Sequence, residues 1–450
     1  MKPFKNVRNP ILPLNIHIPD SEAHVMSDGK LYIYGSYDAY SNLYCSERYH
    51  VISTADMENW NIYNNSFHGS MVPWFNNPDA PKYVSNDWGE PTEFVKKMQE
   101  TTDEDDINFV LTQDLSILPP LLFTPDCIEK DGKYYLYFCM ADGSEGVAVS
   151  DRPEGPFMNP IQLPCSGIDP AVFVDENGDA YYYWGQFRSH AVKLNSDMVS
   201  FDQEKVIDRF LTEEEHFFHE GSSIRRIGDT YYAVFADVER GKPTALGYAT
   251  SKSPLGPFTY RGILIDNTDC DPSSWNNHGS IECFDGKWYI FYHRSSRNTK
   301  IYRRLCIEPI TIREDGTIEE VKMTSQGLGE PFKPGEKLMG YQACGLKGSV
   351  YIDAVNEKDE RPEEALVNIA SGDEVIFRYV KSERDFQSLI IKAEGSGCIE
   401  IWMNDRKAGK VEIQNGQQLR NEIFMEAGEY ELMLRFLSAE KLEVDWIQLA

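Results

Sequence analysis

The sequence lacks the segments that would carry it into a membrane. No stretch approaches the roughly 18 apolar residues needed to cross a bilayer, and residues 1–8 are followed by prolines rather than by the apolar core of a secretory signal. Positive charge is also scarce, because 44 Lys and Arg face 72 Asp and Glu and give a formal net charge of −28. Since nucleic acids and anionic lipid surfaces are negative themselves, we expect neither as a partner, and we expect a neutral substrate.

The motifs of disulfide, metal and phosphate sites are missing as well. The nine cysteines are scattered, and no two form a C-x-x-C pair, which predicts reduced, mostly buried thiols in a cytoplasmic protein. A secreted chain that had lost its leader would look the same in this respect. The run H-x-x-H-E at residues 216–220 fits neither common zinc-enzyme motif, and there is no Gly-rich phosphate loop or G-x-S-x-G elbow. We therefore expect a reaction that requires no cofactor.

What the sequence does contain is a repeat. Five times a tight turn of Asp-Gly, Asn-Gly or Gly-Asp type precedes an aromatic-rich, β-prone run, and the turn glycines are Gly29, Gly132, Gly178, Gly228 and Gly286. The last four lie 46, 50 and 58 residues apart, and the first interval, 103 residues, is about two periods. A period near 50 with several strands in each unit predicts an all-β fold, a five-bladed β-propeller, rather than unrelated hairpins in a sandwich.

The repeat also predicts how the chain divides. Residues 1–325 form the predicted propeller, with an insertion at about residues 70–117 that either walls the mouth of the propeller or lies on the surface. A Gly/Pro-rich connection follows at 327–335. From residue 336 to 450 the texture changes to period-2 runs, at 397–403, 430–436 and 442–447, which indicates a second all-β domain, a β-sandwich.

In a propeller the innermost strand of each blade lines the central channel, and here it should lie just before the turn glycine. The residues that begin this strand in the five units are Asp20, Asp126, Asp169, Glu220 and His278. Each one alone could be a turn, capping or loop residue. Four of them, all but Asp126, lie 8 or 9 residues before the turn glycine, and this shared position instead predicts that three acids and a histidine converge at one end of the channel.

Paired carboxylates facing a neutral substrate suggest glycoside hydrolysis. One acid must be protonated to give its proton to the leaving oxygen, and another must be ionised to activate water. A third carboxylate nearby would raise the pKa of the acid by like-charge repulsion.

The segments around these residues resemble glycoside hydrolase family 43, whose members are five-bladed propeller enzymes that remove pentose units with inversion. The resemblance covers about residues 9–320, and the motifs that carry it lie at 9–25, 124–130, 167–171, 219–224 and 277–281. It implies that Asp20 is the general base, that Glu220 is the general acid, and that Asp169 tunes and orients this acid.

The resemblance also implies substrate-binding roles for His278, Arg303 and Asp126. His278 matches a histidine near the channel centre that in many members helps to hold water or a cation, often calcium. Arg303 looks like the arginine that approaches substrate or acid, with Arg304 as its close competitor. One departure is that many members have Asp-Pro-Ser at the base, whereas this chain has Asp-Ser-Glu at 20–22, which leaves Glu22 as a weaker rival for that role.

The C-terminal part resembles a carbohydrate-binding module of family 6. However, residues 415–419 lack the tryptophan expected to stack on a sugar, so a packing or pocket-shaping role is the alternative. The function expected overall is inverting, exo-acting release of α-L-arabinofuranosyl or β-D-xylosyl units from plant hemicellulose-derived oligosaccharides or polysaccharides. A retaining fructosidase, a sugar phosphorylase or a non-catalytic glycan-binding protein stays open, and the sequence does not predict the oligomeric state.

Overall fold

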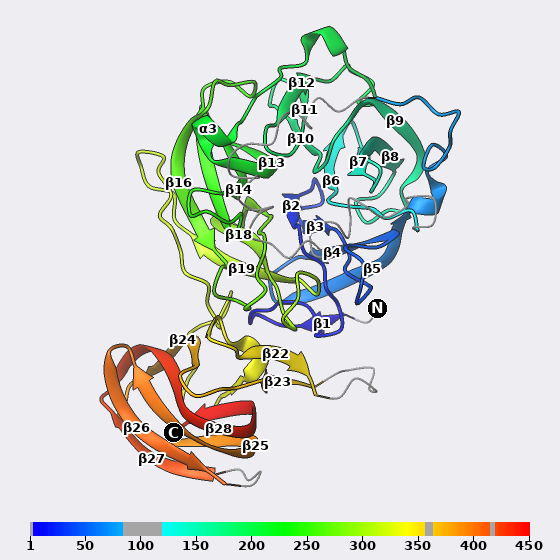
Figure 1. Ribbon diagram of the computed structural model, residues 1–450. Coiled ribbons are helices and arrows are strands. Elements are labelled where there is room, and N and C mark those ends of the chain that lie inside the picture. The colour runs from blue at the N-terminus through cyan, green and yellow to red at the C-terminus, as the bar shows by residue number, and fades with distance from the viewer. Residues whose placement is uncertain (1–2, 84–118, 356–362, 415–418) are drawn as a thin grey trace.

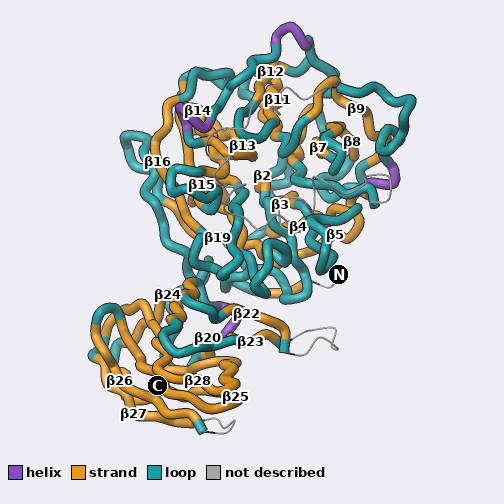
Figure 2. The backbone as a smooth tube through the Cα atoms, in the orientation of Figure 1, coloured by secondary structure: helices purple, strands orange, loops and turns teal. Residues whose placement is uncertain are grey.

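The computed structural model describes residues 3–83, 119–355, 363–414 and 419–450. Almost all regular structure is β-strand, arranged as a ring of five sheets with a separate β-domain beside it (Figures 1 and 2). The prediction of an all-β, five-bladed propeller followed by a second β-domain is confirmed. Within the described ranges, no helix has the length and apolar character needed to span a membrane.

The first two sheets contain five and four strands. The first has the order β1-β5-β4-β3-β2 and the second the order β6-β7-β8-β9. A single 3₁₀ turn, η1 (Gly69–Met71), follows the first sheet. The strands are β1 (Phe4–Lys5), β2 (Glu22–Val25), β3 (Leu31–Gly35), β4 (Arg48–Thr54), β5 (Asn59–His68), β6 (Asp126–Lys130), β7 (Lys133–Cys139), β8 (Ser144–Ser150) and β9 (Met158–Ser166).

The other three propeller sheets run β10-β11-β12, β13-β14-β15-β16 and β17-β18-β19. Between the third and fourth lie the short helices η2 (Gln203–Lys205) and α3 (Glu213–His216). The strands are β10 (Ala171–Val174), β11 (Ala180–Trp184), β12 (His190–Lys193), β13 (Phe218–Ile227), β14 (Thr230–Asp237), β15 (Ala245–Ser251), β16 (Thr259–Asp266), β17 (Ser280–Phe284), β18 (Lys287–Arg294) and β19 (Arg304–Ile310).

The first strand of each repeat is the innermost strand, as the turn spacing predicted. Strand β2 contacts β6, β6 contacts β10, β10 contacts β13, β13 contacts β17, and β17 contacts β2, so the five strands close a ring. The N-terminal segment helps to lock it, because Asn9 Nδ2 donates to Ile307 O at 3.2 Å and Ile11 N donates to Leu305 O at 3.0 Å. First and last blades are thus joined by segments almost 300 residues apart in the chain.

The aromatic residues of the repeat fill the spaces between neighbouring blades. Buried clusters lie between each pair of adjacent sheets, and burial of large side chains in these spaces supplies the main stabilisation of the ring. The sequence Gly-Pro-Phe occurs at 155–157 and at 256–258, and each phenylalanine packs in such a cluster. Phe157 packs on Tyr34, and Phe258 packs on Phe210. The high content of Tyr and Phe therefore reflects blade packing.

The C-terminal domain is one continuous nine-stranded antiparallel sheet around a single apolar core. The long strands β25 and β28 shift register repeatedly where they pair, and such irregularities bend a sheet so that it can curl around its own core. The elements are β20 (Lys337–Met339), η3 (Gly340–Gln342), β21 (Gly345–Lys347), β22 (Tyr351–Ala354), β23 (Glu364–Val367), β24 (Glu374–Ser382), β25 (Phe386–Met403), β26 (Arg406–Ile413), β27 (Leu419–Met425) and β28 (Gly428–Leu449).

The predicted domain limits at residues 325 and 336 stay predictions; the last propeller strand ends at Ile310 and the first strand of the C-terminal sheet begins at Lys337. Most of the predicted insertion at 70–117 and most of the stretch 415–419 lie outside the described residues. All nine cysteines are free and seven are buried, as expected for reduced thiols.

Candidate active site

Four of the predicted site residues stand at corresponding places in their blades. Asp20 precedes β2, Asp169 precedes β10, and His278 precedes β17, while Glu220 is the third residue of β13. Asp20 and Asp169 both have left-handed backbones, with φ of 55° and 56°, a conformation that aspartate adopts more readily than most residues. All four side chains are buried.

Asp20 is held by a hydroxyl and by an arginine. Its carboxylate accepts hydrogen bonds from the Ser36 hydroxyl and from Arg303 Nη1, the latter at 2.7 Å. Burial alone would raise the pKa of Asp20, but the positive charge of Arg303 and the smaller effects of its other neighbours hold this pKa below its ordinary value. Asp20 is therefore the carboxylate of the site that stays ionised.

Arg303 is 1% exposed and joins Asp20 to another buried acid, Asp38. Its backbone N–H and its Nε donate to Asp38 Oδ2 at 3.1 and 3.0 Å, and its Nη2 donates to Asp38 Oδ1 at 2.9 Å. The ring of Tyr44 lies 4.2 Å from the guanidinium carbon. Arg303, which was predicted to bind substrate, thus donates its hydrogen bonds to Asp20 and Asp38.

The neighbouring Arg304 points to the other domain. Its Nη2 donates to Glu364 Oε1, 2.5 Å away, in strand β23. Of the two arginines between which the sequence did not choose, Arg303 is the one brought to Asp20.

Asp169 and Glu220 form a second carboxylate group. Burial raises the pKa of Asp169 well above its ordinary value, and the negative charges of Glu220 and Asp20 raise it further. Two side-chain amides orient Glu220, since Gln186 Nε2 donates to Oε2 at 2.7 Å and Asn276 Nδ2 donates to Oε1 at 3.1 Å. A proton is therefore retained beside Glu220, whereas Asp20 is ionised.

Tyr44 links the two groups. Its hydroxyl donates to Asn276 Oδ1 at 3.2 Å, which leaves the NH₂ group of Asn276 facing Glu220. Because the same ring stacks on Arg303, Tyr44 contacts both the cation beside Asp20 and the amide beside Glu220.

His278 packs between Asp169 and a glycine. Its Nδ1 lies 3.6 Å from Asp169 Oδ2, and a Cβ added to Gly221 would lie 2.5 Å from its Cε1. Gly221 also has a φ of +63°. Only glycine therefore fits directly after Glu220 while the imidazole keeps its place.

Calcium binding at His278 stays a prediction. Calcium takes six to eight oxygen ligands, whereas His278 offers nitrogen and its acidic neighbour Asp169 favours the protonated form. Among the described residues, the grouping of three metal-ligating side chains is Glu22, His24 and Asp126, without His278.

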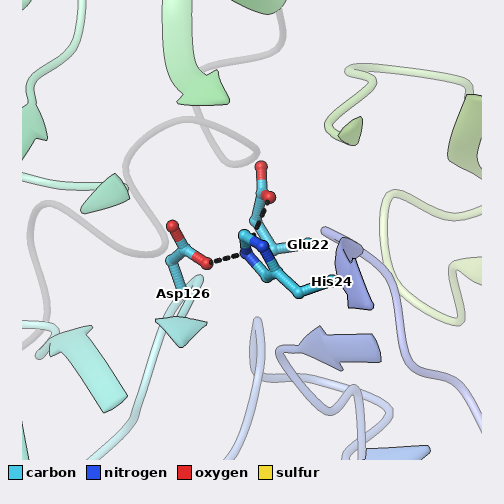
Figure 3. Close-up of side chains that lie close together, drawn as sticks. All are labelled: Glu22, His24 and Asp126. Carbon is cyan, nitrogen blue, oxygen red and sulfur yellow. Dashed lines mark hydrogen bonds and ion pairs between the residues drawn. The ribbon is translucent and has the colours of Figure 1, made fainter. Parts of the chain in front are cut away.

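Asp126 lies in that separate cluster (Figure 3). His24 Nε2 is 2.7 Å from Asp126 Oδ1, and the backbone N–H groups of Cys127 and Val172 donate to the two carboxylate oxygens. The predicted contact of Asp126 with substrate has no support in these bonds. The bond to His24 instead ties the second blade to the first, and the bond from Val172 ties it to the third, three residues after Asp169.

Glu22, the rival candidate for the base, belongs to the same cluster. Its Oε2 accepts a hydrogen bond from Arg225 Nη2 at 3.2 Å and lies 3.6 Å from His24 Nε2. Burial, and then the charge of Asp126, raise the pKa of Glu22 to about 8. A carboxyl that is protonated at neutral pH is poorly suited to accept a proton, so Asp20 is the better base.

Sequence reasoning missed several residues that hold the site: Ser36, Asp38, Tyr44, Gln186 and Asn276. Ser36 and Asp38 directly follow the strand of the first repeat, and Asn276 stands two residues before His278, so their proximity to the motifs was a usable signal. Tyr44 and Gln186 lie in connections without any repeat signal.

Four of the five blades place a buried carboxylate at the start of the inner strand, with Asp20 kept ionised and a proton retained beside Glu220, an arrangement typical of glycoside hydrolases. The sequence model of glycosyl hydrolases family 43 matches residues 96–318. A xylosidase/arabinosidase of Thermoclostridium stercorarium is 31% identical over an alignment of 389 positions that covers 77% of this chain and 74% of that protein. The chain belongs to glycosyl hydrolase family 43, and the predicted family and enzyme class are confirmed.

Two solved structures share the fold. A family 43 beta-xylosidase/alpha-arabinofuranosidase from a compost metagenome, in complex with xylotriose and in its calcium-free form, is 26% identical with a TM-score of 0.53 and covers 71% of this chain and 99% of its own. An arabinoxylan arabinofuranohydrolase of Bacillus subtilis, at 22% identity and a TM-score of 0.51, covers 98% of this chain and 97% of its own. The latter likeness concerns the fold and extends over both domains.

Proposed function

We propose that this protein is an inverting, exo-acting glycoside hydrolase that releases terminal α-L-arabinofuranosyl or β-D-xylosyl units from hemicellulose-derived oligosaccharides. Its relatives bear xylosidase and arabinosidase names, and a solved neighbour was crystallised with xylotriose. The observation that carries the assignment of roles is the opposed protonation of the two carboxylate groups. Arg303 keeps Asp20 ionised, whereas burial and Glu220 keep a proton on Asp169.

The reaction proceeds in one displacement. Asp20 accepts a proton from a water molecule as the water oxygen attacks the anomeric carbon. Glu220 donates a proton to the glycosidic oxygen as its bond to that carbon breaks, and the sugar leaves with inverted configuration. Asp169, whose pKa is raised by burial and by its acidic neighbours, keeps a proton within this pair of carboxyl groups, and Gln186 and Asn276 set the direction of the Glu220 carboxyl.

This acid–base chemistry requires no cofactor. Binding of calcium near His278 stays a prediction, and no step depends on it. His278 packs against Gly221 beside Asp169. A cytoplasmic location also stays a prediction, and it would suit short, imported oligosaccharides.

The experiment is hydrolysis of nitrophenyl α-L-arabinofuranoside and nitrophenyl β-D-xyloside, followed by NMR of the first anomer formed. We expect activity on at least one pentoside, without added phosphate, and a product of inverted configuration. A retained anomer would contradict the single displacement, and a lack of turnover on both pentosides would contradict the proposed substrate class.

A further inference from the structure

We propose that Glu364, in the C-terminal domain, is a positioning residue for the propeller active site, and that it acts through the segment 295–303. This segment connects β18 to β19 and ends at Arg303. The inference rests on the proposed function, because it concerns the arginine that keeps the proposed base ionised.

The C-terminal domain contacts both ends of this segment. Near the start, Arg297 N donates to Ile352 O at 2.8 Å, and Arg297 Nη2 lies 3.5 Å from Glu364 Oε1. Just after the end, Arg304 Nη2 donates to the same Glu364 oxygen at 2.5 Å. The Glu364 carboxylate of β23 thus bridges Arg297, near the start of the segment that carries Arg303, and Arg304, directly after its end.

The bridge is buried and has no substitute. The side chain of Glu364 is 0% exposed and that of Arg304 is 4% exposed. Arg304 Nε and Nη1 have no hydrogen-bond partner among the described residues, so Glu364 is the acceptor on which this guanidinium depends. Removal of one partner from a buried ion pair leaves the other charge uncompensated, which is strongly unfavourable and forces local rearrangement.

Contacts within the segment close it on itself and connect it to the site. The hydroxyl of Ser296 donates to Tyr302 O at 2.8 Å, and the Tyr302 ring lies 4.4 Å from the Arg297 guanidinium carbon. On its other side, the Tyr302 ring is 4.9 Å from the His17 ring. His17 O in turn accepts a hydrogen bond from the backbone N–H of Asp38 at 3.0 Å. Asp38 is the acid that accepts three hydrogen bonds from Arg303.

Arg303 and Arg304 are therefore neighbours at the end of this connection that bind different parts of the protein. The guanidinium of Arg303 faces Asp20 and Asp38, while that of Arg304 faces Glu364. Loss of the Glu364 anchor should loosen residues 295–304 and weaken the contact between Arg303 and Asp20. The titratable groups around Asp20 are Asp38, Asp169, His278 and His293. Burial lowers the pKa of both histidines, so the charge of Arg303 is the main effect that keeps Asp20 ionised.

The test is Glu364→Gln in the full-length enzyme, with Ser325→Ala as the matched control. Ser325 Oγ accepts a hydrogen bond from Arg378 N at 3.2 Å and so joins the connection after β19 to strand β24 of the C-terminal domain, outside the 295–304 segment. Because a misplacement of about 1 Å can cost as much as about 100-fold in rate, we expect kcat/KM to fall by a factor in this range for Glu364→Gln. We also expect the acidic limb of its pH profile to move to higher pH.

The control should keep both the rate and the pH profile of the wild type. Asp353→Asn is a milder second variant, since Asp353 Oδ1 lies 4.0 Å from Arg297 Nε and is partly exposed; it should produce a smaller change in the same direction. A Glu364→Gln enzyme that unfolds at a lower temperature but keeps the wild-type pH profile and kcat/KM would overturn the proposal.

Hydrogen–deuterium exchange separates this inference from the proposed function. Faster exchange across residues 295–303 in Glu364→Gln, but not in Ser325→Ala, supports the anchor even if wild-type protein fails to hydrolyse pentosides. Unchanged exchange in Glu364→Gln, beside a wild type that is active, rejects the anchor and leaves the proposed function intact.

Discussion

Arg303 Nη1 donates a 2.7 Å hydrogen bond to Asp20 Oδ1 from a side chain that is 1% exposed. This contact lowers the pKa of a carboxyl whose burial would otherwise raise it. The chain binds the same arginine to Asp38 through three further hydrogen bonds, so the cation that activates Asp20 has little freedom to move.

Loss of this charge should change the pH dependence of catalysis. In Arg303→Met, the pKa of Asp20 should rise, because the largest effect that opposes its burial is then lost. Since the base must be ionised, the acidic limb of kcat/KM should move to higher pH, and activity at neutral pH should fall. Measurement of kcat/KM between pH 4 and pH 9 checks this, with Arg303→Lys, which keeps a charge, expected to move the limb less.

Removal of the proposed acid should depend on the leaving group. In Glu220→Ala, turnover of unactivated oligosaccharides should fall by roughly 10²–10⁴-fold, the usual contribution of general acid catalysis. A dinitrophenyl pentoside, whose leaving group needs little protonation, should retain much more of the wild-type rate. Equal losses on both substrates would argue that Glu220 acts by another route.

The hydroxyl of Tyr44 should contribute through Asn276. Tyr44→Phe keeps the ring over Arg303 but removes the donor to Asn276 Oδ1. The side-chain amide of Asn276 can then rotate and present its oxygen instead of its NH₂ group to Glu220. One lost hydrogen bond of about 0.5–1.5 kcal/mol corresponds to a loss of roughly 2- to 12-fold in kcat. Steady-state kinetics at several pH values check this. If the acidic limb of the kcat/KM profile of Tyr44→Phe is unchanged, the substitution acts on Glu220, whereas a shifted limb would show that it acts on Arg303.

Alanine substitutions at Gly221 and Gly228 separate two costs to stability, a steric clash and a strained backbone. Gly221 and Gly228 have nearly the same backbone, at φ +63° and +62°, but an added Cβ meets His278 at Gly221 and nothing within 4 Å at Gly228. Gly228→Ala should cost about 1–2 kcal/mol of stability for its left-handed backbone, and Gly221→Ala about 1–3 kcal/mol more because of the clash. Urea unfolding measures both variants, and equal losses would show that the imidazole moves freely.

Glu22 should make stability fall as the solution becomes more alkaline. Its pKa is raised from 4.5 to about 8 in the folded protein, so the folded state retains a proton that the unfolded chain releases above pH 4.5. The resulting penalty grows between pH 4.5 and 8 and levels off above this range. Glu22→Gln should therefore show a flatter dependence of Tm on pH between 5 and 8.

Glu282→Gln is the control for that measurement, because Glu282 Oε2 also accepts from Arg225, at 3.1 Å. If both substitutions flatten the dependence of Tm on pH equally, the effect comes from loss of an ion pair with Arg225. If neither does, Glu22 is not the group that retains the proton.

Much of the architecture is encoded locally in the sequence. A Gly turn followed by alternating aromatic residues forms a hairpin wherever it occurs, so the five copies reveal the number of blades and the innermost strand of each. The residue that begins that strand could be found in the same way, which placed Asp20, Asp169, Glu220 and His278 correctly on their blades.

The partners of these residues could not be found in this way. Asp126 shares the repeat position, but its carboxylate binds His24 of the first blade, the backbone N–H of Cys127 in its own strand and that of Val172 in the next blade, because a strand's first residue can turn along the ring as well as across it. Tyr44 and Gln186 reach the site from irregular connections, whose paths depend on contacts with distant residues.

The sequence by itself determined the blades, the family and the acids that a glycosidase needs, because these follow from periodic hydrophobic patterns and short turns. Only the tertiary structure decided which acid is ionised and which arginine serves it. The pKa of Asp20 depends on a cation 283 residues away in the chain, and Arg303 and Arg304 differ only in the surroundings that folding provides. Burial and through-space charge, which have no local sequence signature, assign the roles.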